Sequence, residues 1–256
     1  DISNSNIDIF GDWLNSNLEI NKYPFKYCII NNFLKDEIYE KIYNDFPNKI
    51  DNEFWEYSNP LEVKYVLDKI VFIKDEIKNL FFALSHDKIL KKFKETFILD
   101  NLEYDPYLHG AGIHMHPRNG RLNMHLDYEK HPYLNKQRRL NVIYYVNKEW
   151  DKKWNGDTQL WDNNMKNCIV RSFPKKNTAI IFETIENSWH GVPDKILCPS
   201  NIYRKTLAYY YISKLVNKKN TNKFGANNDG YRKKAVFVKR PDDIYDERLE
   251  KLFKIR

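Results

Sequence analysis

One histidine and one aspartate with a single residue between them, His125-Leu126-Asp127, form the first pair in this sequence whose spacing suits a chemical task. Residues i and i+2 of a β-strand project from the same face of the sheet, so the imidazole and the carboxylate can share one metal ion. A pair of this kind also arises by chance in many chains. It becomes a predicted metal site only if a third ligand lies elsewhere in the sequence.

The third ligand that we expect is His190, which follows a predicted strand at Thr178–Glu183. Two histidines and one carboxylate on one face of a metal ion form the facial triad of non-haem Fe(II) oxygenases, which leaves coordination positions open. The sequence therefore predicts an Fe(II) site made of His125, Asp127 and His190.

An arginine at the start of a later predicted strand suits a carboxylate ligand. Arg204 has Thr206 on the same strand face, and a guanidinium beside a hydroxyl can clamp a carboxylate. The order of His-x-Asp, a strand-rich interval, histidine and then arginine matches the 2-oxoglutarate oxygenases. We therefore expect 2-oxoglutarate as a co-substrate held by Arg204 and Thr206, with O2 as the oxidant.

Short β-type runs separated by turn residues fill the sequence from about Leu102 and must position these side chains. The predicted strands are Glu103–His109, Gly112–Pro117, Arg121–Asp127, Arg139–Asn147, Thr158–Asp162, Cys168–Phe173, Thr178–Glu183 and Arg204–Ser213. Eight short strands after a helical prefix predict a mainly β protein with helical support. The architecture that we expect is a double-stranded β-helix (jelly roll, cupin-like) with N-terminal helices packed outside.

The first hundred residues have mostly helical periodicity. Helices are predicted at Asn32–Phe46, at about Asn59–Leu84 and at Lys88–Phe97. We expect residues 1–100 to support a catalytic core at 101–215. Residues 216–256 are predicted to add a basic C-terminal loop (217–230) and a helix (242–255), all within one structural unit.

The dipeptide Asn119-Gly120 is a strong signal for a two-residue hairpin turn. Such a hairpin would place His116 opposite Asn123 and His114 opposite His125. Since facing residues share a sheet face, we expect His114, His116 and Asn123 to line the metal pocket and to contact the substrate or support the metal ligands. The alternative is that the histidines only have structural partners at the mouth of the barrel.

From about Gly112 to Ser213 the chain resembles the prolyl-4-hydroxylase-like branch of the Fe(II)/2-oxoglutarate-dependent dioxygenases. Residues 139–162 (RLNVIYYVNKEWDKKWNGDTQLWD) look similar to the equivalent stretch of oxygen-sensing prolyl hydroxylases, with a Tyr-Tyr-x-Asn strand and a Lys-x-Trp loop. The resemblance implies a double-stranded β-helix that binds iron through the three residues named above. It also implies that Arg204 binds the distal carboxylate of 2-oxoglutarate and that Tyr145 donates its phenol to the same carboxylate.

The positive charge of the chain is concentrated near its C-terminal end. The formal net charge is +7, and nine Lys or Arg with one acid lie between Lys214 and Arg240, so the rest of the chain is nearly neutral. A solvated lysine-rich surface is the simpler interpretation, and recruitment of an anionic partner is the alternative. We expect neither nucleic acid nor membrane as a partner, because the charge is local and no apolar run could span a bilayer.

Three cysteines, Cys28, Cys168 and Cys198, form no disulfide framework and have no metal-ligand spacing. Their number favours a reducing compartment. We therefore expect a globular, cytoplasmic protein.

These observations together predict an Fe(II)- and 2-oxoglutarate-dependent dioxygenase that hydroxylates an unactivated C–H bond and releases succinate and CO2. The resemblance favours a prolyl residue or a proline-like amino acid as the substrate, so the partner is a small molecule or a peptide. The alternatives are a small-metabolite hydroxylase of the same family, a cupin-like metalloenzyme that does not use 2-oxoglutarate, and a binding module without catalysis.

Overall fold

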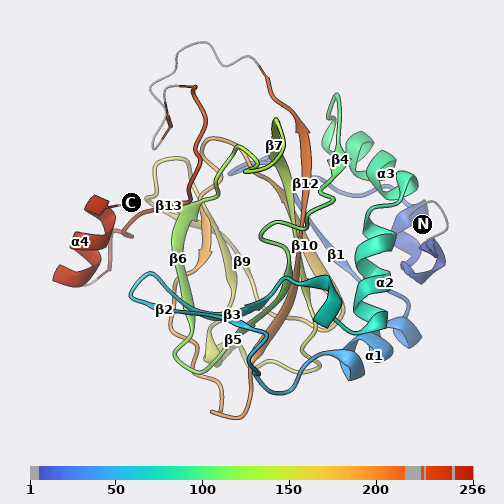
Figure 1. Ribbon diagram of the computed structural model, residues 1–256, viewed down its shortest axis with the longest axis horizontal. Helices are drawn as coiled ribbons and strands as arrows, with labels where there is room; N and C mark the ends of the chain where they lie inside the picture. The colour runs from blue at the N-terminus through green and yellow to red at the C-terminus, as the bar shows by residue number, and fades with distance from the viewer. Residues whose placement is uncertain (1–5, 217–225, 228, 244–245, 256) are drawn as a thin grey trace.

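The chain folds around one antiparallel sheet that curls into a double-stranded β-helix (Figure 1). The computed structural model describes residues 6–216, 226–227, 229–243 and 246–255. Within them the sheet runs in the order β1-β10-β7-β12-β5-β3-β6-β11-β8-β9. The predicted jelly roll is therefore confirmed.

The sheet has two halves that β3 joins. The first half contains β1 (Tyr27–Asn31), β10 (Thr178–Glu183), β7 (Lys136–Tyr145), β12 (Arg204–Lys214) and β5 (Gly112–His116). The second half contains β6 (Arg121–Leu126), β11 (His190–Val192), β8 (Thr158–Trp161) and β9 (Cys168–Ser172). Beside β3 (Glu62–Leu67), the remaining strands are β2 (Trp55–Asn59), which pairs with β3, β4 (Glu103–Tyr104), which pairs with β12, and β13 (Val236–Phe237), which pairs with β6.

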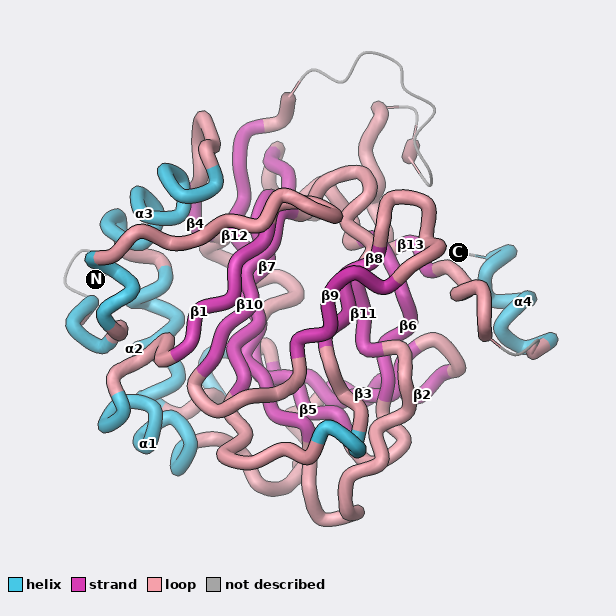
Figure 2. The backbone as a smooth tube through the Cα atoms, turned by 180° about the vertical axis from the view of Figure 1, so that it is seen from behind, coloured by secondary structure: helices cyan, strands magenta, loops and turns pink. Residues whose placement is uncertain are grey.

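The helices lie outside the barrel (Figures 1 and 2). Those on the side of β1 and β12 are α1 (Asp36–Asp45), α2 (Asp75–Leu84) and α3 (Asp87–Phe97), whereas α4 (Glu247–Ile255) lies on the opposite side, near β13. Short 3-10 helices occur at Ile7–Ile9, Asp12–Asn15, Ile70–Phe72 and Lys152–Trp154. In the described residues no helix is long and apolar enough to cross a membrane.

The strand β12 shows how the barrel separates its core from its cavity. Its outward side chains Tyr209 and Tyr211 contact the aromatic rings of Phe81 in α2 and Phe93 in α3, at centroid distances of 6.1 and 5.6 Å. Its inward side chains line the barrel cavity, and these are Arg204, Thr206, Ala208 and Tyr210. Alternation along one strand thus supplies both the hydrophobic core and the candidate site.

The prediction of a helix over residues 59–84 is wrong in its first part. Residues Glu62–Leu67 form β3, which pairs with β2 on one edge and with β5 and β6 on the other. The α-helix is limited to Asp75–Leu84. The strand prevails because its backbone pairs with three other strands and because Val66 and Leu67 become buried, a tertiary effect that local periodicity does not contain.

Elsewhere, the strands predicted after Leu102 are present, although the first is limited to β4. Besides β3, four strands were not predicted: β1 and β2 lie in the part expected to be mostly helical, and β11 and β13 have only three and two residues. Strands this short leave no alternating pattern that could be recognised. The predicted C-terminal helix is present as α4, and most of the predicted loop at 217–230 lies outside the described residues.

The predicted hairpin between β5 and β6 is also wrong. The turn itself exists, because Asn119 has a φ of 64° and the Gly120 amide donates to the carbonyl oxygen of Pro117 at 2.8 Å. However, β5 and β6 follow one another in the same direction along one edge of β3. After the turn, the chain resumes its pairing with the same edge of β3 and does not fold back on β5. The expected pairs of His116 with Asn123 and of His114 with His125 therefore do not form.

Candidate metal and co-substrate site

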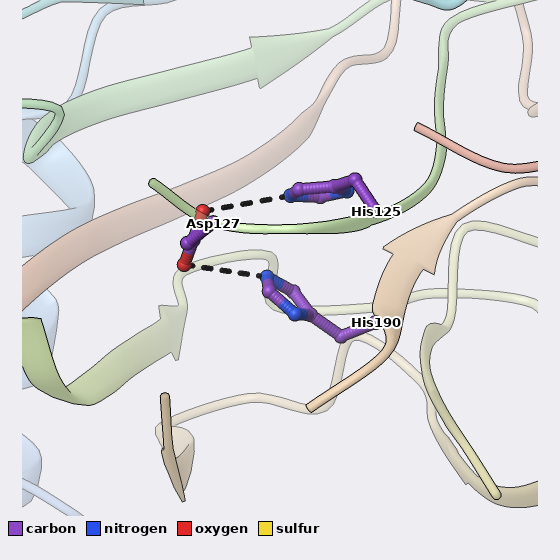
Figure 3. Close-up of side chains that lie close together, drawn as sticks. All are labelled: His125, Asp127 and His190. Carbon is purple, nitrogen blue, oxygen red and sulfur yellow. Dashed lines mark ion pairs between the residues drawn. The ribbon is translucent and has the colours of Figure 1, made fainter. Parts of the chain in front are cut away.

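Three side chains, from β6, the residue after it and β11, point toward one another (Figure 3). His125 in β6 pairs with His190 in β11, and Asp127 lies directly after β6. The Asp127 oxygens Oδ1 and Oδ2 each lie 3.6 Å from the Nε2 atom of one histidine, His125 and His190 respectively. The three candidate ligand atoms all lie within 4.8 Å of one another, so the structure brings together the residues predicted to form the triad.

Backbone carbonyls orient the two imidazoles. The Nδ1 atom of His125 lies 2.8 Å from the carbonyl oxygen of Asn123, and the Nδ1 atom of His190 lies 2.8 Å from that of Ser188. A carbonyl oxygen accepts only from Nδ1–H, so these contacts favour the tautomer whose Nε2 lone pair faces the centre of the triad.

The electrostatics of the triad also suit a metal ion. Burial, and next the neighbouring His125, lower the pKa of His190 to about 4, so this imidazole is neutral near pH 7. Burial opposes the charge of Asp127, but His190, Arg138 and His125 outweigh it and hold the pKa of the carboxyl well below its usual range. Oδ2 of Asp127 is buried and has no hydrogen-bond partner among the described residues. Two imidazole nitrogens and a carboxylate oxygen therefore fit Fe(II).

The three triad residues line a cavity of about 500 Å³. Its wall carries both polar and apolar side chains. The polar and charged ones beyond the triad include Glu62, Lys64, His114, His116, Tyr128, Arg138, Asn141, Arg204, Thr206, Tyr210 and Lys234, and the apolar ones include Leu122, Ile143, Val192, Ala208 and Phe237. The volume is typical of a site for a small ligand.

Arg204 is a buried cation in the wall of this cavity, with 2% of its surface exposed. Its Nε donates to the carbonyl oxygen of Gly156 at 2.6 Å, and one terminal nitrogen donates to the Thr158 hydroxyl at 2.9 Å. No carboxylate of the described residues makes an ion pair with it. Because an unpaired buried charge is costly, this guanidinium fits a carboxylate ligand such as the distal end of 2-oxoglutarate.

The other two residues expected near the co-substrate differ in placement. Thr206 lines the cavity, with its hydroxyl 3.5 Å from the carbonyl oxygen of His114. The Tyr145 hydroxyl instead lies 2.8 Å from that of Thr158 and 2.9 Å from the carbonyl oxygen of Ser172. Tyr145 is absent from the cavity wall, and its ring lies 5.4 Å from the Arg204 guanidinium carbon.

Two further histidines lie in the cavity wall even though the hairpin that suggested them does not exist. His114 and His116 pair with Thr206 and Arg204 of β12 instead. Nε2 of His114 and both ring nitrogens of His116 are buried without a hydrogen-bond partner among the described residues. Burial, with Lys64 and Arg204 nearby, lowers the pKa of His114 to about 3, so it meets a ligand as a neutral imidazole.

Asn123 does not line the cavity. Its side chain is buried, and its backbone carbonyl orients His125. The expectation that it reaches the pocket failed because it depended on the hairpin register.

Arg138 was not predicted from the sequence, and it lies in the cavity wall within ion-pair distance of Asp127. Simple alternation backward from Ile143 through Asn141 would turn Arg139 inward. The pairing of β7 with β12 shifts register between Tyr211 and Ile212, and this bulge turns Arg138 inward instead. No local signal in the sequence marks the bulge.

A family model of known proteins matches the barrel core of this chain. Residues 111–212 match the family model described as the 2OG-Fe(II) oxygenase superfamily. The matched segment contains His125, Asp127, His190 and Arg204.

Three solved structures share the fold. A prolyl-4-hydroxylase from Pseudomonas putida aligns with a TM-score of 0.54 at 11% identity, over 74% of this chain and 93% of that one. A prolyl hydroxylase from Trichoplax adhaerens, in complex with a hypoxia inducible factor peptide fragment, gives a TM-score of 0.51 at 17% identity, over 80% and 88%. A 2OG-Fe(II) oxygenase family oxidoreductase from Burkholderia pseudomallei gives 0.51 at 14% identity, over 72% and 84%.

Proposed function

We propose that this 2OG/Fe(II)-dependent dioxygenase, whose residues 111–212 match the 2OG-Fe(II) oxygenase superfamily, hydroxylates an unactivated C–H bond of its substrate. In this proposal His125, Asp127 and His190 hold the iron, and Arg204 with Thr206 binds the distal carboxylate of 2-oxoglutarate. The observation that carries the assignment is that the triad and an arginine without a carboxylate partner among the described residues face one cavity.

The protein's own residues supply binding, orientation and exclusion of water. When bound, Fe(II) and 2-oxoglutarate supply the oxidising chemistry, in which O2 is consumed, 2-oxoglutarate leaves as succinate and CO2, and one oxygen atom enters the substrate. The carbonyls of Asn123 and Ser188 keep both histidine Nε2 atoms directed at one point. The neutral His114 and His116 offer hydrogen bonds to a polar ligand beside Arg204.

A prolyl residue or a proline-like amino acid is the substrate that we propose. Two of the proteins that share the fold are prolyl hydroxylases by their descriptions. The apolar side chains of Ile143, Val192 and Phe237 in the cavity wall offer contact to a saturated ring. A small metabolite of another class is the alternative within the same chemistry.

The substrate can be tested by mass spectrometry. The protein is incubated with Fe(II), 2-oxoglutarate and O2, and with either a proline-containing peptide or free L-proline. A mass gain of one oxygen atom on either compound, absent in the His125→Ala variant, would support the proposal and choose between peptide and amino acid. Succinate release that neither compound stimulates would reject proline and leave a different small metabolite.

A further inference from the structure

We propose that Arg138 is a positioning residue for Asp127, which it holds by Oδ1 so that Oδ2 is the oxygen presented to the metal ion. The inference rests on the proposed function, in which Asp127 is a metal ligand. Arg138 acts through Asp127 and needs no contact with iron, co-substrate or substrate.

The contact between the two side chains is direct and buried. A terminal nitrogen of Arg138 lies 3.3 Å from Oδ1 of Asp127, and the two side chains are 4% and 9% exposed. Water and salt screen a pair at this depth little. The other carboxylate oxygen, Oδ2, has no hydrogen-bond partner among the described residues, so the two oxygens of Asp127 are in different environments.

Arg138 is itself fixed on both faces of its guanidinium group. The guanidinium carbon lies 3.6 Å from the ring centroid of Tyr128 and 3.5 Å from that of Tyr210. Two rings at these distances must occupy opposite faces of the plane. Asn141 donates to the Tyr210 hydroxyl at 3.2 Å and so holds the second ring in place.

The edge of the guanidinium group is held as well. A second terminal nitrogen of Arg138 donates to the carbonyl oxygen of His109 at 2.9 Å and to the hydroxyl of Tyr128. Gly110 closes this edge, because a β-carbon at that position would collide with the same nitrogen, and the glycine has a φ of +74°. Lysine cannot reproduce these contacts, because it has neither a planar group that stacks between two rings nor a fixed fork of N–H donors.

A carboxylate can bind a metal ion through one oxygen or two. Arg138 occupies Oδ1 and therefore favours binding through Oδ2 alone. This choice keeps a coordination position free, which the proposed reaction needs for 2-oxoglutarate and O2. Loss of Arg138 should leave the fold intact but lower the metal affinity and change the coordination, as removal of a partner of a metal ligand commonly does.

Cobalt(II) alone is a suitable probe, because its visible absorption bands respond to coordination number and geometry without any turnover. We expect Arg138→Gln to weaken Co(II) binding about 10- to 100-fold and to change the shape of the Co(II) spectrum. Arg138→Lys should recover part of the affinity but not the wild-type spectrum. The matched control is Arg139→Gln, because the neighbouring arginine lies outside the cavity and pairs with Glu183 at 3.1 Å, so both readouts should stay unchanged.

A folded Arg138→Gln variant with wild-type Co(II) affinity and spectrum would overturn the inference. If thermal unfolding shows that this variant does not fold, Gly110→Ala tests the same point by pushing the guanidinium group from outside, and an unchanged spectrum there would equally reject it. If wild-type protein binds no Co(II), or binds it equally after His125→Ala, the proposed metal site fails instead.

Discussion

At the scale of single residues, some polar side chains of the site have hydrogen-bond or ion-pair partners and others have unpaired polar atoms. Arg138 has partners around its whole guanidinium group, whereas Arg204 has no carboxylate partner among the described residues, and ring nitrogens of His114 and His116 in the cavity wall have no hydrogen-bond partner there. Because buried polar groups without partners are costly, this second group is where a polar ligand gains most. Two predictions follow from the difference.

Replacing Arg204 by alanine should weaken 2-oxoglutarate binding about 10- to 100-fold, since a hydrogen bond to a charged group contributes about 1.5–3 kcal/mol. Isothermal titration of the Co(II)-loaded protein with 2-oxoglutarate measures this. The matched control is Arg118→Ala, because Arg118 donates only to the backbone oxygens of Leu197 and Cys198 among the described residues. Wild-type affinity in Arg204→Ala would show that the co-substrate binds elsewhere.

Replacing His116 by leucine should lower the affinity for 2-oxoglutarate without lowering the free energy of unfolding. The ligand-free variant should be as stable as wild type or more stable, by about 1 kcal/mol, because two buried nitrogens without partners are removed. Its affinity for 2-oxoglutarate should fall. Urea unfolding and calorimetry measure the two effects, and Met115→Leu on the opposite face of β5 is the control. A lower free energy of unfolding with unchanged affinity would mean that His116 is only structural.

At the scale of elements, the triad depends on the contact between β6 and β11. These strands pair His125 with His190, and Gly191 follows with almost no space beside it. A β-carbon at Gly191 would lie 2.8 Å from the carbonyl oxygen of Leu122 and 2.9 Å from that of Asn123. Both oxygens belong to β6, so any side chain here pushes against the strand that carries His125.

Gly191→Ala should therefore separate the two strands. We expect a loss of about 1–3 kcal/mol in the free energy of unfolding, typical of overpacking, together with weaker Co(II) binding because His190 is displaced. Urea unfolding and Co(II) titration measure both quantities. Alanine at the more exposed Ile169 of β9 is the control. If Gly191→Ala binds Co(II) like wild type, the triad does not depend on this close contact.

Sequence patterns predicted some elements well and others poorly, for physical reasons. Long strands such as β7, β10 and β12 have β-type composition and turn residues at their ends. The position of β3 depends on three partner strands, and β11 is too short to carry a pattern. The predicted register between β5 and β6 was wrong, because a local turn signal does not show whether the chain reverses direction after the turn or continues in the same direction.

At the scale of the whole molecule, the jelly roll gathers residues that lie far apart in the sequence. Residue type and order were enough to predict that His125, Asp127, His190 and Arg204 share one cavity, because the predicted metal binding and carboxylate binding need particular groups. Arg138 could not be selected, since a bulge in β7 decides which of two adjacent arginines turns inward. The helices α1–α3 cover one face of the barrel (Figure 1), and alternate side chains of β12 line the cavity.

The most direct test of the account is an anaerobic absorption titration of the metal-free protein with Fe(II) and then 2-oxoglutarate. Chelation of the metal by 2-oxoglutarate produces a weak visible charge-transfer band. We expect this band to appear with wild-type protein, to be lost in His125→Ala, and to need a higher 2-oxoglutarate concentration in Arg204→Ala. Fe(II) binding without any band on addition of 2-oxoglutarate, or a band that both substitutions leave unchanged, would contradict it.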